Sequence, residues 1–276
     1  MKTAGVKDAM EDLHPSVIIG VLILAGLYAG SAHYSGRKIR TLHALSFGAG
    51  LMVMLVALCG PIDELEDSRL FAAHMLQHLL LCLVMPPLLL LGVSDWMLRP
   101  IMLARGIRPV ARMVTNPIIA FFIYNLSLAL LHAPRVYDLM CRNENFHITA
   151  HIILMAAGVI MWWPLLSPLP ELPRLSYPAQ MLYLFAMLIP MAAVAAPISL
   201  SQTVVYKWYL EGPHPFGISP LADQVAGGLM MWVGAGFYEI CVASLIFYRW
   251  ASWEDRDEPP VGVATLPPVS HLSRVR

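Results

Sequence analysis

The sequence has few charged residues. Only 13% of its 276 residues are Asp, Glu, Lys or Arg, and 58% are hydrophobic. An ordinary soluble domain is about a quarter charged, and the mean hydropathy here is +0.65. This imbalance excludes an ordinary soluble protein. It predicts a polytopic membrane protein, since each helical crossing needs about 20 apolar residues.

Blocks of basic residues and targeting signals are missing as well. The formal net charge is zero, so nothing indicates a nucleic-acid partner. The N-terminal residues MKTAGVKDAMEDLHP lack the basic and then apolar order of a cleavable signal. We therefore expect the first apolar segment to be retained.

Cysteine pairs and common catalytic motifs are also absent. The four cysteines, Cys59, Cys82, Cys141 and Cys241, show no paired spacing, so they predict neither a disulfide framework nor a thiolate zinc site. The sequence has no Gly-rich phosphate loop, no Ser/His/Asp order and no H-E-x-x-H. A conventional hydrolase or nucleotide-dependent enzyme is therefore not indicated.

The chain does contain seven apolar segments, which predict an all-α bundle of seven transmembrane helices. The segments are residues 16–34, 42–60, 71–92, 117–132, 147–166, 177–200 and 220–250. We expect an extracytoplasmic N-terminal segment (1–15), a seven-helix membrane domain (16–250) and a disordered, polar cytoplasmic tail (251–276). Pro86, Pro87 and Pro190 fall inside segments and are expected to kink them.

The basic residues predict the orientation of the bundle. Two thirds of the 18 Lys and Arg residues fall in the C-terminal tail and in the connections on the same side. The connection between the second and third segments is acidic, with Asp63, Glu64, Glu66 and Asp67. The positive-inside rule then places the N-terminus outside and the C-terminus in the cytoplasm.

Histidines gather at the predicted outer ends of the segments. His74 and His78 begin the third segment four residues apart, which places both imidazoles on one helix face about 6 Å apart along the axis. The fifth segment begins with a second H-x-x-x-H. The candidate metal ligands are His74, His78, His132, His147, His151 and Asp223.

Imidazole and carboxylate together suit zinc, copper, iron or nickel, and six groups can hold one ion or a pair. Three other interpretations stay open. The histidines can instead join helices by hydrogen bonds, or two of them can be axial ligands of a haem. Met75 and Met230–Met231 can meet soft copper(I), although packing alone also explains methionines.

Four separated segments resemble the signature regions of the CtaG-type assembly factors of caa3 cytochrome c oxidase. They are HMLQHLLLCLVMPPLLLLG, LHAPRVYDLM, HITAHIILMAAGVIMWWPLL and SPLADQVAGGLMMW. The resemblance runs from the second apolar segment to the end of the seventh. By motif match, the six candidate ligands take the family's polar positions, and Tyr137, Asp138 and Gln224 match neighbouring ones.

The resemblance implies a multi-pass protein of the bacterial plasma membrane that helps to form a haem–copper oxidase by supplying copper. Its partners would be the lipid bilayer and cytochrome c oxidase subunits. The histidine pattern favours a metal carrier over an enzyme. Two alternatives stay open: a metal- or haem-dependent membrane oxidoreductase, and an assembly chaperone that needs no metal.

Overall fold

The structure, a computed structural model, describes residues 15–212 and 215–257. Helices joined by turns make up these ranges, which contain no strand, so the all-α prediction is confirmed. Within them, six helices are long and apolar enough to cross a membrane. The chain is therefore a multi-pass membrane protein.

The six candidate spans follow the order of the apolar segments. They consist of α2 (Pro15–Ser35); α3 (Thr41–Cys59) with α4 (Pro61–Asp67); α5 (Phe71–Leu79) with α6 (Met85–Gly92); α11 (Glu144–Leu166); α12 (Tyr177–Leu200); and α13 (Pro220–Leu229) with α14 (Ala235–Asp257). Shorter helices connect them: α7 (Asp95–Met102), α10 (Pro134–Cys141), and the 3₁₀ turns η2 (Lys207–Leu210) and η3 (Pro215–Gly217).

The predicted fourth span differs from a simple crossing. Helix α9 (Pro117–Leu131) has 15 residues, or about 22 Å, which is less than the bilayer core of about 30 Å. Helix α8 (Arg108–Val114) precedes it at an angle of 71°, and only the two together make a seventh span. The bend lies where Asn116 caps α9, accepting hydrogen bonds from the amides of Ile118 and Ile119.

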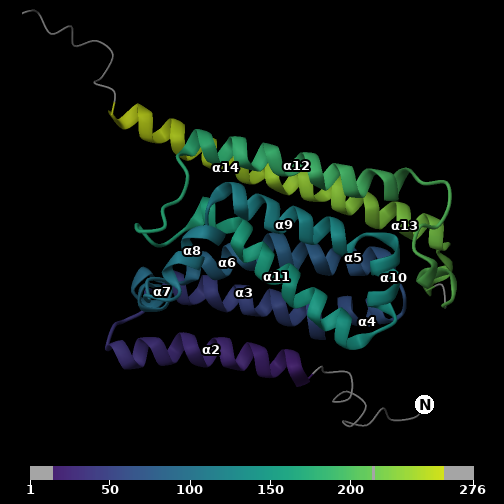
Figure 1. Ribbon diagram of the computed structural model, residues 1–276, viewed down its shortest axis with the longest axis horizontal. Helices are drawn as coiled ribbons and strands as arrows, with labels where there is room; N and C mark the ends of the chain where they lie inside the picture. Colours follow the sequence, from purple (N-terminus) through teal and green to yellow (C-terminus); the bar gives the residue numbers. More distant parts are fainter. Residues whose placement is uncertain (1–14, 213–214, 258–276) are drawn as a thin grey trace, which may run out of the picture.

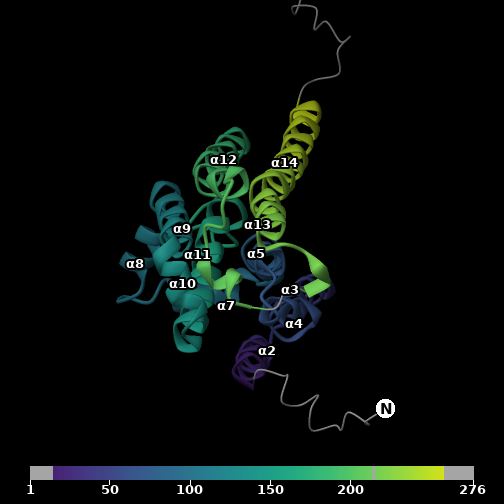
Figure 2. The ribbon, with the colours of Figure 1, turned by 90° about the vertical axis from the view of Figure 1, so that its right-hand side faces the viewer.

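The long helices lie side by side along the bundle (Figure 1). Helix α2 lies at one edge, beside α3, and α12 and α14 form the opposite edge (Figure 2). Among the residues of α2, Val21 is buried, while Tyr28 stacks on Phe47 at 4.0 Å and donates a hydrogen bond to the Gly92 carbonyl. The core therefore lies among α5, α6, α9 and α11 and the inner faces of α12 and α13.

The prolines of the third span coincide with a π-helical turn, η1 (Leu80–Val84). Pro86 and Pro87 have no N–H, so the carbonyls of Cys82 and Leu83 lose their usual helical donors. The Trp162 indole donates to the Cys82 carbonyl at 2.9 Å, and the Tyr238 hydroxyl donates to the Leu83 carbonyl at 2.8 Å. Side chains from two other spans thus replace the missing backbone bonds, as a membrane interior requires.

Two helix boundaries differ from the apolar segments. Helix α11 begins at Glu144, where Asn143 caps it by accepting from the Phe146 amide. Helix α14 continues to Asp257, past residue 250, because a helix need not end where its apolar run ends. Residues 1–14 of the predicted N-terminal segment (1–15) lie outside the described residues. So do residues 258–276 of the predicted tail (251–276).

Candidate metal centre

Five of the predicted ligands form one cluster of rings at one end of the bundle. His74 and His78 come from α5, His147 and His151 from α11, and His132 follows the last residue of α9. The His74 ring centroid lies 4.3 Å from that of His78, 5.2 Å from that of His147 and 5.7 Å from that of His151. His78 lies 5.5 Å from His132. The sequence prediction that these histidines converge is therefore met by the geometry.

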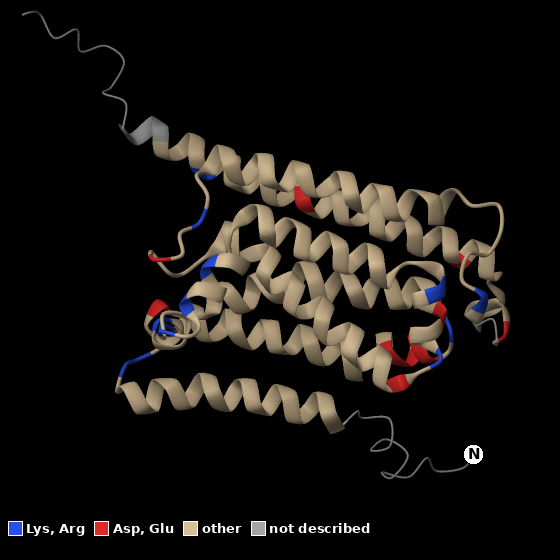
Figure 3. Ribbon diagram, viewed as in Figure 1, with Lys and Arg blue, Asp and Glu red and all other residues tan. Residues whose placement is uncertain are grey.

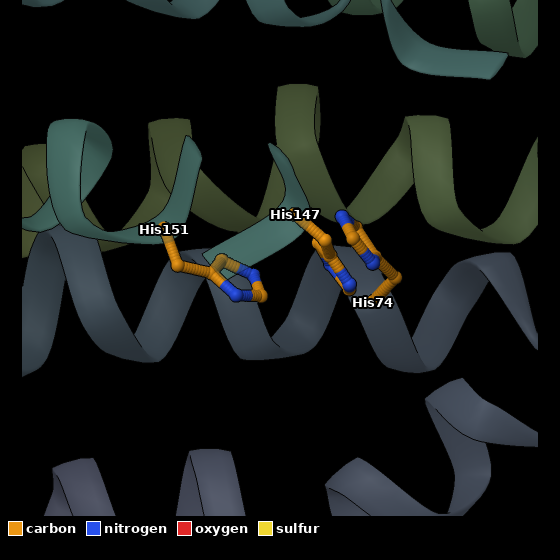
Figure 4. A group of neighbouring side chains, drawn as sticks. All are labelled: His74, His147 and His151. Atoms are coloured by element: carbon orange, nitrogen blue, oxygen red, sulfur yellow. The ribbon is translucent and has the colours of Figure 1, made fainter. Parts of the chain in front are cut away.

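Three of the five histidines form a close group that could hold a metal ion. One nitrogen each from His74, His147 and His151 lie within 4.8 Å of one another. Figure 4 shows the three rings directed toward one another, His74 from α5 and the other two from α11. We call these three residues the histidine triad. Metal–nitrogen bonds are about 2.0–2.1 Å long, so the three rings would have to move closer together to share one ion.

Several ring nitrogens in the cluster lack hydrogen-bond partners among the described residues. These buried atoms include Nε2 of His74, Nδ1 of His78, Nε2 of His132 and Nε2 of His151. A buried polar atom without a partner costs about 1–3 kcal/mol, and such atoms are rare in folded proteins. Direct hydrogen bonds between the described residues therefore leave these nitrogens without partners, and a bound metal ion would give them one.

Glu66, which the sequence marks only as part of an acidic connection, contacts the cluster. Its Oε1 lies 2.9 Å from Nδ1 of His74, which leaves Nε2 of that ring for a ligand. A carboxylate on the second nitrogen of a metal-binding imidazole fixes its tautomer and raises its basicity. Helix α4 comes directly before α5, and the left-handed backbone conformation of Arg69 (φ 65°) between them brings Glu66 back toward His74.

Asp223, the sixth predicted ligand, lies elsewhere. Its carboxylate accepts hydrogen bonds from the backbone amides of Phe71 (2.6 Å) and Ala72 (2.9 Å), and it is not part of the triad. It thereby caps the first turn of α5 from α13. Gly227 permits this approach, because a Cβ there would collide with the Phe71 ring. A negative charge at this position also offsets the helix dipole, which otherwise opposes a cation near His74.

An aromatic cap packs against the cluster at this end of the bundle. We define this aromatic cap as Phe71, Tyr137, Tyr206 and Tyr209. Tyr137 stacks on Tyr206 with centroids 4.0 Å apart, and its hydroxyl lies 2.8 Å from that of Tyr209. The Tyr137 ring is 5.5 Å from His74, and the Tyr206 hydroxyl donates to the His132 carbonyl at 2.9 Å. Burial raises the pKa of Tyr137, Tyr206 and Tyr209, so the cap stays uncharged.

The connection from α12 to α13, which carries half of this cap, is fastened to its neighbours through Trp208. Arg69 lies 3.8 Å and Arg142 5.2 Å from the Trp208 ring centroid. Arg142 also pairs with Glu211 at 2.6 Å, and this hydrogen bond lowers the pKa of Glu211. Asp138 accepts from the Trp208 amide at 3.2 Å. The connection is thus fastened beside the cluster, whereas His147 of the triad stays half-buried.

The resemblance also named Tyr137, Asp138 and Gln224, and all three lie in the aromatic cap or hold the α12–α13 connection in place. Tyr137 is in the aromatic cap, and Asp138 holds Trp208. Gln224 accepts from the Val205 amide at 2.6 Å and donates to the Ile198 carbonyl at 3.0 Å. Their positions indicate a structural role above the histidines.

One further histidine in the described part of the chain stands apart from the cluster. His43 lies on α3 and contacts Ser94 at 3.0 Å, at the end of the bundle opposite α4. Figure 3 shows basic residues near α7 and α8 at that end and the acidic α4 near the cluster. His14, His214 and His271 lie outside the described residues.

Comparisons with known proteins place this arrangement in context. Uncharacterized proteins of Mycobacterium bovis and Mycobacterium tuberculosis are each 27% identical over 212 residues, covering 68% of this chain, and one of Mycobacterium leprae is 25% identical over 206 residues. The chain spans about a third of the length of these relatives. No solved structure matches. A family model described as cytochrome c oxidase caa3 assembly factor matches residues 21–252.

Proposed function

This chain belongs to the family of cytochrome c oxidase caa3 assembly factors, whose model covers most of its length, and from that premise we propose that it delivers copper to the oxidase. The histidine cluster binds the ion at the extracytoplasmic side of the bacterial plasma membrane, and a ligand of an oxidase subunit then takes it by exchange. Copper is the cargo in this proposal, since the enzyme being assembled is a haem–copper oxidase.

The observation that carries the proposal is the set of buried imidazole nitrogens without partners, gathered from three helices. Neutral imidazole suits copper and zinc. A triad leaves one coordination position open for a ligand from the recipient. Glu66 would hold the His74 ring in the tautomer that presents Nε2.

The same geometry favours an ion over a haem. A porphyrin needs a flat slot between its two axial imidazoles. Here the rings pack directly against one another, with neighbouring centroids 4.3–5.7 Å apart. A bare metal ion fits between such rings without moving the helices apart.

The test is elemental analysis of purified full-length protein after incubation with copper. We expect wild-type protein to retain copper, and the His147→Ala/His151→Ala variant to retain less copper per protein molecule than the wild type. His43→Ala is the matched control, since His43 lies outside the cluster. In cells that depend on this protein, the double variant should also lower the copper content of the oxidase. Equal oxidase copper in wild type and variant would instead support an assembly chaperone that needs no metal.

A further inference from the structure

A small cavity lies next to the histidine triad, deeper in the bundle. It has about 10 Å³ of free space, which is room for about one water molecule or one ion. Its lining includes two imidazoles, three thioethers and a thiol. We call it the sulfur chamber, after its imidazole-bearing and sulfur-bearing lining residues His78, His132, Met75, Cys82, Met191 and Met231.

The helical period explains why α5 contributes residues to both the histidine triad and the sulfur chamber. His74 and His78 share one face at a spacing of four, and Met75 and His78 share the adjacent face at a spacing of three. His78 therefore borders both the triad and the chamber. Its ring lies 5.1 Å from His151 on one side and 5.5 Å from His132 on the other.

Two π-helical turns bring further sulfur atoms to the same place. Cys82 lies in η1 (Leu80–Val84), and Met231 lies in η4 (Met230–Gly234). Such turns occur frequently at functional sites. Here one lies on the third span and the other on the last span, and each contributes a lining residue to the chamber.

The two imidazoles distinguish this lining from the other places where methionine is buried. Other buried methionines, such as Met54 and Met161, do not line the chamber. In the chamber, the three methionines are at most 4% exposed. They meet His78 and His132, each of which has a buried ring nitrogen without a partner among the described residues. Thioether and imidazole together select a soft monovalent ion over a harder divalent one.

We propose that the sulfur chamber is a second metal site, specific for Cu(I) and connected to the triad through His78. This inference rests on the proposed function only for the identity of the ion, which is copper. The ion moves between the two sites by exchange of ligands at His78. No electron is transferred, so the ion in the chamber enters and leaves as Cu(I).

Two probes separate the sites in purified full-length protein. Ag(I) stands for a soft monovalent ion, and Co(II) stands for an ion that prefers imidazole. We expect Met191→Leu/Met231→Leu to weaken Ag(I) binding at least tenfold and to leave the Co(II) spectrum unchanged. We expect His147→Ala/His151→Ala to abolish the Co(II) spectrum while Ag(I) binding remains.

The matched control is Met54→Leu/Met161→Leu, which removes two buried thioethers outside the chamber and should change neither titration. Unchanged Ag(I) affinity in Met191→Leu/Met231→Leu would overturn the proposal. X-ray absorption of the Cu(I)-loaded wild type tests it without any variant: sulfur neighbours are expected, and a shell of nitrogen alone would exclude the chamber. Wild-type protein that binds Ag(I) but no Co(II) would contradict the triad as a site and leave the chamber standing.

Discussion

Glu66 reaches the cluster from a helix that contributes no histidine. Its carboxylate holds Nδ1 of His74 at 2.9 Å and is itself 11% exposed, whereas the His74 side chain is fully buried. The carboxylate therefore sets the orientation of a ring that has no contact with solvent. Its influence on the metal should be large for a residue that does not touch the ion.

Removal of this carboxylate should weaken metal binding without disturbing the fold. We expect Glu66→Ala to reduce Co(II) or Cu(II) affinity about 10- to 100-fold, the usual range for a lost carboxylate partner of a metal-bound histidine. Glu66→Gln should lose less, because its amide oxygen still accepts from Nδ1. The control is Glu64→Ala on the exposed face of α4. Titrations with the same affinity for Glu66→Ala and wild type would show that the contact has no part in metal binding.

Substitution of Asp223 tests whether this residue is a metal ligand or a cap of helix α5. Asp223→Ala leaves the Phe71 and Ala72 amides without their acceptor, and we expect a loss of about 2 kcal/mol in the free energy of unfolding. Copper stoichiometry at saturation should not change. Hydrogen exchange should rise in the first turn of α5. A variant of normal stability that has lost its copper would show that Asp223 is a ligand after all.

The residues of the cluster were predictable in part. Two features predicted that the histidines lie together: the repeated H-x-x-x-H spacing, and their position at the same predicted end of three apolar segments. These histidines are His74, His78, His132, His147 and His151. Glu66 was not found, because its contact depends on the turn at Arg69, which no periodicity indicates. The capping role of Asp223 depends on how closely α13 approaches α5, and this distance is set by Gly227 in three dimensions.

At the scale of the helix, the third span shows how a membrane protein accommodates two consecutive prolines. The positions of the two prolines in the sequence predicted a distortion of this helix. The donors that satisfy the freed carbonyls, Trp162 and Tyr238, come from α11 and α14. Sequence spacing within one helix carries no information about such partners.

The Tyr238 hydroxyl should matter only because Pro87 lacks an N–H. We expect Tyr238→Phe to cost about 1 kcal/mol of unfolding free energy, in the range of measured hydrogen bonds between membrane helices. In a Pro87→Ala background, the restored amide can bond the Leu83 carbonyl, so the same substitution should cost little. Denaturation of the four proteins in detergent gives the coupling. A cost independent of the residue at position 87 would refute this account.

For the whole molecule, the order of the spans was predictable from apolar length, but their number depends on one bend. The angle of 71° between α8 and α9 follows from a cap at Asn116 and from the short apolar run after it. The sequence indicated a short segment there without indicating that α8 turns away. The distribution of Lys and Arg remains the argument for orientation.

Cysteine labelling should decide that orientation. In a background free of native cysteines, Glu64→Cys at the histidine end and Arg105→Cys at the opposite end are both on exposed positions. A maleimide that cannot cross membranes should label position 64 in intact cells and position 105 only after permeabilisation. The reverse pattern would place the histidine cluster in the cytoplasm and remove the proposed route to the oxidase.

In the proposed function, the fastening of the α12–α13 connection beside the cluster would separate the affinity for the ion from the rate of its release. The imidazoles would determine the equilibrium affinity. The connection, held by the contacts of Trp208 with Arg69 and Arg142, would determine the rate, because it would have to move before an outside ligand reaches the cluster. A recipient that binds this connection would therefore speed release without changing affinity. Delivery could then be selective in time while the resting protein retains its ion against small chelators.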